Sequence, residues 1–143
     1  MNENASLFFV DRHVDSHIKE KKAFIEYGSN QKFITYADLH EQSSKLRHFF
    51  SKFKINREDR VIILMQDVTA YPIIFWGCLK SGVIPILLNT LLSSEVVSEI
   101  IDNSRANAVF ISTGLLNSFE NSLKNNANIK QIIEDCKQFV RDT

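Results

Sequence analysis

The chain has 143 residues, enough for one domain with a buried core, and 44% of them are hydrophobic, as in ordinary globular proteins. Lysine plus arginine and aspartate plus glutamate number 17 each, so the formal net charge is zero. That balance gives no electrostatic reason to expect nucleic acid or an anionic membrane as a partner. Cys78 and Cys136 lie far apart, so we expect reduced thiols and a cytoplasmic protein rather than a disulfide framework.

The first third of the chain predicts a helix, a hairpin and a second, longer helix. Residues 7–17 carry apolar side chains on one side, which is typical of a short amphipathic helix. Two β-prone runs at 23–27 and 33–35 flank a polar loop, which favours a hairpin. Thr35 is placed to cap a helix whose apolar residues recur every three or four positions, with Ser43 in the middle of that stripe.

From residue 60 onward, strands alternate with helices. The helix after the first strand should begin after Thr69 and end at Gly82 in a left-handed cap, the next should open at Ser93 or Ser94, and the last should be capped by Thr113. This alternation predicts an α/β fold, a mostly parallel sheet with helices on both faces, within one subdomain spanning residues 1–143. The expected strands are 60–65, 83–88, 108–111 and 129–133.

Phosphate-binding loops need glycines, because backbone amides must approach the oxygens closely. The chain has four glycines and no G-x-G sequence. Gly77 and Gly82 have the spacing of a P-loop, but Val83 stands where the lysine belongs, and the pair falls inside a predicted helix. We therefore interpret that spacing as a coincidence.

A metal site can be considered at the start of the chain. His13 and His17 are four residues apart, with Asp11 and Asp15 nearby, so both imidazoles would share one helix face. Further ligands at a recognisable spacing are missing from the sequence. We therefore favour two exposed polar residues on a surface helix.

The sequence supports a catalytic nucleophile with its base no better than it supports a metal site. Cys78 lies between Gly77 and Leu79 in an apolar helix, which favours a small buried core residue over a reactive thiol. His40 and His48 lie on a charged helix face and match no Ser or Cys in a catalytic pattern. We expect both histidines to be solvated.

Two features remain open as parts of a substrate site. Trp76 next to Phe75 could line a pocket for an aromatic substrate, although a core aromatic is the favoured interpretation. Asn89 and Thr90 follow a predicted strand, where functional loops of α/β sheets lie. The favoured alternative is that Asn89 hydrogen-bonds its own loop.

Four strings occur in order along the chain: ITYADL (34–39), EDRVIILM (58–65), KSGVIPILLN (80–89) and DNSRANAVFIS (102–112). In their order and intervals they resemble the beginning of the adenylate-forming superfamily of acyl-CoA synthetases, luciferases and peptide-synthetase adenylation domains. Three more strings, FFVDRHV (8–14), AFIEYG (23–28) and LLNTLLSSE (87–95), look like benzoate-CoA ligases. Glu58 departs from the glycine that the family often has there, which should alter only a turn.

The resemblance implies an incomplete part of a larger adenylation domain. Such enzymes use ATP, Mg²⁺ and CoA to convert an acid, here an aryl acid such as benzoate, into its CoA thioester, AMP and pyrophosphate. The family's phosphate loop, ribose-binding aspartate, magnesium-binding glutamate and adenylation lysine have no matching positions here. The resemblance therefore implies no catalytic, cofactor-binding or metal residue in this chain.

The expected partners follow from that interpretation. They are the remainder of the adenylation domain and, through apolar surface left uncovered, further copies of this chain; neither nucleic acid nor a membrane is expected. The alternative is a stand-alone interaction or scaffold module that kept the fold without the chemistry.

Overall fold

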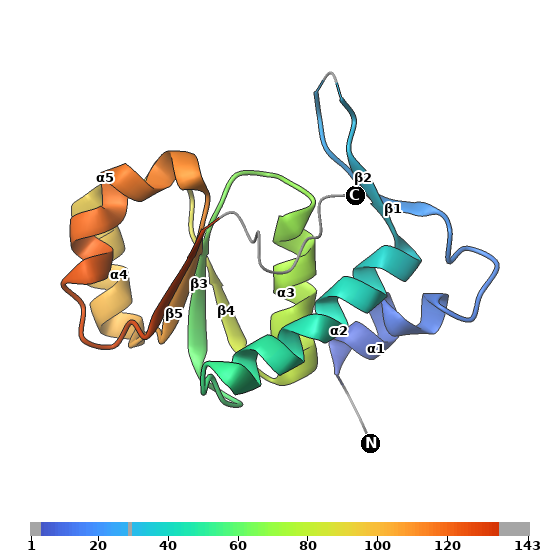
Figure 1. Cartoon of the computed structure of the whole chain (residues 1–143), viewed down its shortest axis with the longest axis horizontal. Coiled ribbons are helices and arrows are strands. Elements are labelled where there is room, and N and C mark those ends of the chain that lie inside the picture. Colours follow the sequence, from blue (N-terminus) through green and yellow to red (C-terminus); the bar gives the residue numbers. More distant parts are fainter. Residues whose placement is uncertain (1–3, 29, 135–143) are drawn as a thin grey trace.

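A computed structural model describes residues 4–28 and 30–134 of the chain (Figure 1). A short N-terminal helix and an antiparallel hairpin precede a four-stranded sheet in which helices alternate with strands. The elements are α1 (Ala5–Phe9), the 3-10 helix η1 (Asp11–His13), β1 (Lys22–Ile25), β2 (Phe33–Thr35), α2 (Tyr36–Lys52), β3 (Arg60–Leu64), α3 (Ala70–Ser81), β4 (Ile84–Leu87), α4 (Ser94–Ser104), β5 (Ala108–Ile111), α5 (Thr113–Lys124) and β6 (Gln131–Glu134).

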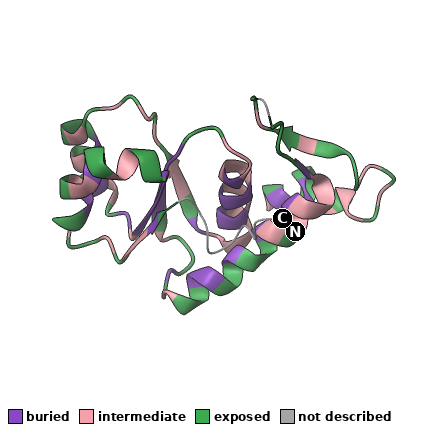
Figure 2. Ribbon diagram, turned by 45° about the horizontal axis from the view of Figure 1, so that its top comes forward, coloured by how far each residue is buried: buried purple, intermediate pink, exposed green. Residues whose placement is uncertain are grey.

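The sheet is parallel throughout, in the order β4-β3-β5-β6, with α2 and α3 on one face and α4 and α5 on the other (Figure 1). Side chains alternate along β3: Val61 and Ile63 pack toward α2 and α3, whereas Ile62 and Leu64 pack toward α4 and α5. Burial on both faces explains the unbroken apolar run of this strand and confirms the predicted α/β class. Figure 2 shows the buried residues gathered on the sheet and the inner faces of its helices, with the hairpin mostly exposed.

Local capping chemistry confirms most of the predicted helix boundaries. Thr35 and Asp38 form a capping box at α2, in which the Thr35 hydroxyl accepts from the Asp38 N–H and the Asp38 carboxylate accepts from the Thr35 N–H. Gly82 ends α3 with φ +71°, a left-handed conformation that glycine adopts without steric cost. Of the two serines considered for α4, Ser93 is the cap, accepting from the Val96 N–H.

The predicted single helix over residues 7–17 is wrong. Helix α1 ends at Phe9, Val10 leaves helical geometry at φ −122° and ψ −62°, and a 3-10 turn follows at Asp11–His13. The break buries Val10 completely and turns Asp11 toward α2 and α3. Burial of one side chain and ion pairing of the next therefore override the local periodicity.

Two boundaries near the end of the described chain also differ from prediction. Ser112, rather than Thr113, is the N-cap of α5, and Thr113 is the first helical residue. The Ser112 hydroxyl accepts from the Gln66 N–H at 3.0 Å, so it joins the ends of β3 and β5 instead of capping its own helix. The last strand lies at Gln131–Glu134 rather than 129–133.

Within residues 4–28 and 30–134, no helix is long and apolar enough to cross a membrane.

Candidate functional site

An apolar cleft of about 490 Å³ lies where the strands end, between the hairpin and the first turns of α3. The segment after β3 and the last residue of β4 both contribute to it, so it lies at the carboxyl edge of the sheet, where α/β proteins usually bind ligands. Its volume is within the range of small-molecule sites. The lining residues are Phe24, Ile25, Glu26, Asp67, Val68, Thr69, Tyr71, Pro72, Phe75, Trp76 and Leu87.

Two polar contacts fix the walls of this cleft. The Glu26 carboxylate accepts from the Thr69 N–H at 2.6 Å and from the Thr69 hydroxyl at 2.9 Å, which ties the hairpin to the start of α3. Thr69 was predicted as the α3 cap, and it holds that position, but its hydroxyl bonds Glu26 instead of the helix. Burial, together with the negative charge of Asp67, raises the pKa of Tyr71, so this phenol stays protonated over the physiological range.

Trp76 and Phe75 are both partly buried, pack against the core and line the cleft. Their ring centroids are 5.1 Å apart, and Phe9 of α1 approaches Trp76 at 5.8 Å. The favoured interpretation of Trp76 as an ordinary core aromatic is therefore incomplete, because one side of the pair faces open space. Such a wall can bind an aryl or alkyl group through apolar contact.

The loop after β4 does not join the cleft. The Asn89 side chain accepts from the Leu91 N–H at 2.9 Å, which is the local turn interaction that the sequence favoured. Thr90 is half-buried and lies outside the lining. The cleft thus receives Leu87 from this strand but neither of the two polar residues that follow it.

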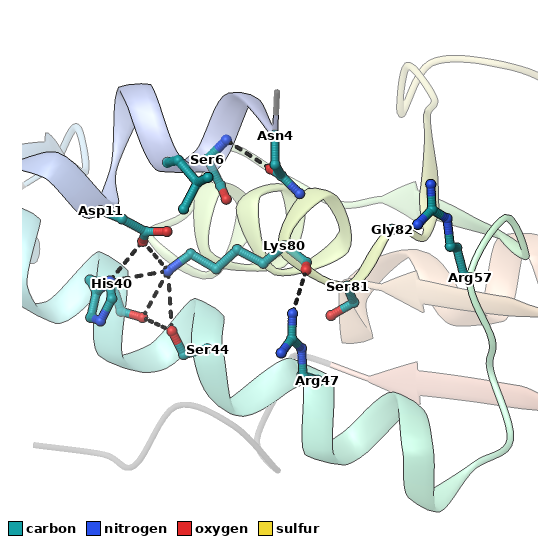
Figure 3. A pocket seen from close by; sticks show the side chains of 11 residues that line it. Asn4, Ser6, Asp11, His40, Ser44, Arg47, Arg57, Lys80, Ser81 and Gly82 are labelled. Carbon is teal, nitrogen blue, oxygen red and sulfur yellow. Dashed lines mark hydrogen bonds and ion pairs between the residues drawn. The ribbon is translucent and has the colours of Figure 1, made fainter. Parts of the chain in front are cut away.

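A second, polar pocket of about 880 Å³ lies at the opposite edge of the sheet, around the last turn of α3 (Figure 3). Lys80 anchors one end of it, with a side chain only 8% exposed. Its ammonium group lies 2.6 Å from the Asp11 carboxylate, 3.1 Å from the Ser44 hydroxyl and 3.3 Å from the carbonyl oxygen of His40. One lysine therefore joins η1, α2 and α3.

Asp11 and His40 complete this cluster. The Asp11 carboxylate lies 2.7 Å from His40 Nδ1. Burial alone would raise the pKa of Asp11, but the hydrogen bonds and positive charges of Lys80 and His40 outweigh it and hold that pKa below its usual value. The His40 side chain is 38% exposed, so it keeps solvent contact as expected, but its pairing with Asp11 was not predicted. His48 is exposed, as predicted.

The two histidines considered as metal ligands lie outside the linings of both pockets. Because the helix breaks after Phe9, His13 and His17 do not share a helix face. His13 packs against Tyr36 in a tilted arrangement with ring centroids 4.7 Å apart, and His17 is exposed. Within the described ranges, no three His, Cys, Asp or Glu side chains gather in a way that could hold a metal ion.

Cys78 is completely buried in α3, and burial raises the pKa of its thiol far above the physiological range. A thiol that stays protonated and out of contact with solvent is a poor nucleophile, as the sequence interpretation favoured. Cys136 lies outside the described residues. Gly77 lies within α3 and Gly82 at its C-terminus. The two glycines therefore do not form a phosphate-binding loop, despite their P-loop spacing.

Solved structures of other proteins share the arrangement of this sheet, its covering helices and the N-terminal hairpin. The structure is similar to a benzoate CoA ligase from Burkholderia xenovorans, with a TM-score of 0.82, 24% identity, and coverage of 95% of this chain and 26% of that chain. It is also similar to an anthranilate CoA ligase, with a TM-score of 0.82, 18% identity, and coverage of 90% and 24%. At these identities the likeness shows the fold.

Sequence comparison gives relatives of the same kind. A 4-hydroxybenzoate–CoA/benzoate–CoA ligase of Rhodopseudomonas palustris is 29% identical over 130 residues, which is 91% of this chain and 24% of that protein. An acetyl-coenzyme A synthetase of Leptospira biflexa is 31% identical over 114 residues, 78% of this chain and 17% of that protein. This chain thus spans about a quarter or less of the length of these curated relatives.

The family assignment follows from a match over almost the whole chain. Residues 10–142 match the model of the AMP-binding enzyme family. The chain belongs to that family, the adenylate-forming enzymes that include CoA ligases. The resemblance derived from the sequence strings is therefore confirmed.

Proposed function

We propose that this chain is the N-terminal part of an ATP-dependent acid–CoA ligase that activates benzoate or another small aryl acid. The observation that carries the proposal is the 29% identity to a 4-hydroxybenzoate–CoA/benzoate–CoA ligase across 91% of this chain. The apolar cleft bounded by Phe75 and Trp76 supports it, because an aromatic wall at the carboxyl edge suits a flat apolar acid.

In the proposed reaction, the carboxylate of the acid attacks the α-phosphate of ATP and releases pyrophosphate, and the CoA thiol then displaces AMP. Mg²⁺ bound to the complete enzyme would supply neutralisation of phosphate charge. Among the described residues, no three His, Cys, Asp or Glu side chains gather in a way that could hold a metal ion, so we assign no magnesium ligand to them and derive no step through the ion. The role proposed for this chain is to supply scaffold and part of an apolar wall.

A substrate competition tests the proposed acid class. In a polypeptide that continues this chain through the rest of an AMP-binding domain, benzoate should exceed decanoate by more than about tenfold in kcat/KM. The expected ratio follows because one ring or methylene contact typically changes the free energy of transition-state binding between two substrates by ~1–3 kcal/mol. The measurement is CoA-dependent pyrophosphate release with both acids, and a preference for decanoate would contradict the aryl assignment while leaving the family intact.

The alternative is a stand-alone scaffold that kept the fold without the chemistry. The reading frame after Thr143 distinguishes this scaffold from the proposed ligase. A frame that continues into a Gly-, Ser- and Thr-rich phosphate loop supports the ligase, and a stop codon supports the scaffold. The cytoplasmic location stays a prediction that rests on cysteine usage.

We also propose that this chain alone associates with copies of itself. Large apolar side chains are exposed around the cleft and the hairpin, and such patches drive association. Sedimentation over a range of concentrations should show a dimer or larger species, and a strictly monomeric chain that binds no hydrophobic dye would contradict this. The exposed residues of that region include Phe24, Ile25, Tyr27, Phe33 and Leu87.

A further inference from the structure

The polar pocket carries more positive than negative charge. Three permanent cations line it, Lys80, Arg47 and Arg57, against one carboxylate, Asp11. Asp11 lies 2.6 Å from the Lys80 ammonium, so these two charges offset each other. The two guanidinium groups leave the pocket with net positive charge.

Within the described chain, neither arginine forms a strong ion pair with a carboxylate. Arg47 is exposed and donates from Nη2 to the Lys80 carbonyl oxygen at 3.0 Å, which occupies one of its five N–H donors (Figure 3). Arg57 lies 4.0 Å from the Glu58 carboxylate, and both of those side chains are about four-fifths exposed (84% and 79%). Such an exposed pair contributes little, so both guanidinium groups keep N–H donors for a ligand.

The pocket surrounds the C-terminal turn of α3, where free carbonyl groups would normally repel an anion. Here the last carbonyl groups already accept hydrogen bonds. Cys78 and Leu79 accept from the backbone N–H groups of Val83 and Gly82, at 2.9 and 3.2 Å. Leu79 also accepts from the Asn4 amide at 2.7 Å, and Lys80 accepts from Arg47. Each of these carbonyl groups already accepts at least one hydrogen bond, which reduces the repulsion.

Ser81 adds an unused donor to the same surface. Its hydroxyl oxygen is buried and, among the described residues, has no hydrogen-bond partner. A buried hydroxyl without a partner is costly, and a bound ligand is one explanation for its retention. Figure 3 shows Ser81 between Arg47 and Arg57 along the pocket.

We propose that this pocket binds a small phosphate-bearing anion, with Arg47, Arg57 and the Ser81 hydroxyl as donors. A phosphate or pyrophosphate group presents several acceptor oxygens, and arginine is suited to binding them because its planar N–H groups match their geometry. The volume of about 880 Å³ also accommodates a larger molecule that carries such a group. This site lies at the opposite edge of the sheet from the apolar cleft, and it does not depend on the proposed ligase function.

Calorimetric titration of the chain with inorganic pyrophosphate, at neutral pH and low ionic strength, tests the proposal. We expect saturable binding that weakens as salt is added. Arg47→Gln and Arg57→Gln should each weaken binding by about tenfold or more, the usual effect of losing a charge-assisted hydrogen bond. Lys130→Gln is the matched control, because Lys130 is exposed and lies outside the pocket, and it should change the affinity by less than about twofold.

Ser81→Ala separates a ligand-binding hydroxyl from a structural one. Removing an unpaired buried hydroxyl should leave the Tm of the free chain unchanged or raise it by a few degrees, roughly 2–5 °C, while pyrophosphate binding weakens several-fold. Parallel titrations with phosphate and ATP distinguish a free anion from a nucleotide as the source of the phosphate group. The absence of saturable binding to all three anions, or equal binding by the wild type and both arginine variants, would overturn the proposal.

Discussion

Gly77→Ala should lower the free energy of unfolding of this chain by about 2–3 kcal/mol, a large share of a typical domain's stability. A β-carbon at Gly77 would lie 2.8 Å from both Cβ and Cδ2 of Leu46 and 3.0 Å from the Ser43 carbonyl oxygen. Two of these three atoms, the Leu46 Cβ and the Ser43 oxygen, sit on or next to the α2 backbone, so a rotamer change cannot relieve the clash. Helices α2 and α3 must instead move apart.

Gly114→Ala is the matched control for that variant. Gly114 lies in the first turn of α5, and a β-carbon there meets nothing within 4 Å. Alanine favours a helix over glycine by about 0.5–1 kcal/mol, so this variant should be neutral or slightly more stable. Urea unfolding at one fixed protein concentration measures both variants. Equal stability of the two would show that α2 and α3 do not approach as closely as described.

Lys80→Met should lower the free energy of unfolding by about 1–3 kcal/mol near neutral pH. The substitution keeps the apolar stem but removes the ammonium group that bonds Asp11, Ser44 and the His40 carbonyl, leaving a half-buried carboxylate with one partner fewer. Lys45→Met is the control, since Lys45 pairs with Glu41 on the exposed face of α2 and should cost less than about 0.5 kcal/mol. Similar losses in both variants would contradict a stabilising role for the buried cluster.

The pH dependence of the wild type provides a second measurement of the same cluster. The pKa of Asp11 is lower in the folded chain than its ordinary value of 3.8. The stabilisation from Asp11 is therefore fully present above that ordinary value and is lost as the pH falls through the lower, folded pKa. Asp11→Asn should remove this contribution to acid sensitivity, so urea unfolding of both chains across pH 3 to 7 should show a shallower acid loss for the variant. Parallel curves for the two chains would contradict the assignment.

The sheet and most helix boundaries were predictable because each depended on local chemistry. The unbroken apolar run at β3 indicated a strand covered on both faces, and Thr35 and Gly82 marked helix ends through capping and left-handed geometry. The start of the chain was not predictable in the same way. Its helix breaks at Val10 because Asp11 reaches Lys80, a contact between residues 69 positions apart.

Contacts between residues far apart in the sequence also limited the prediction of sites. Phe75 and Trp76 were recognised as candidates, but the wall that faces them comes from Phe24 and Ile25 of the hairpin. The cluster of Asp11, His40 and Lys80 was missed because its members lie on three different elements. The weak signal available was Lys80 itself, the one charged residue in helix α3.

We propose that this chain contributes fold to an acid–CoA ligase and does not by itself perform the chemistry. The most direct measurement is pyrophosphate release by the purified chain of residues 1–143 with benzoate, ATP and Mg²⁺, beside a longer polypeptide that continues it through an AMP-binding domain. We predict no release above a protein-free control for the chain and benzoate-dependent release for the longer polypeptide. Turnover by the chain alone, abolished by substituting one of its own residues, would contradict the account.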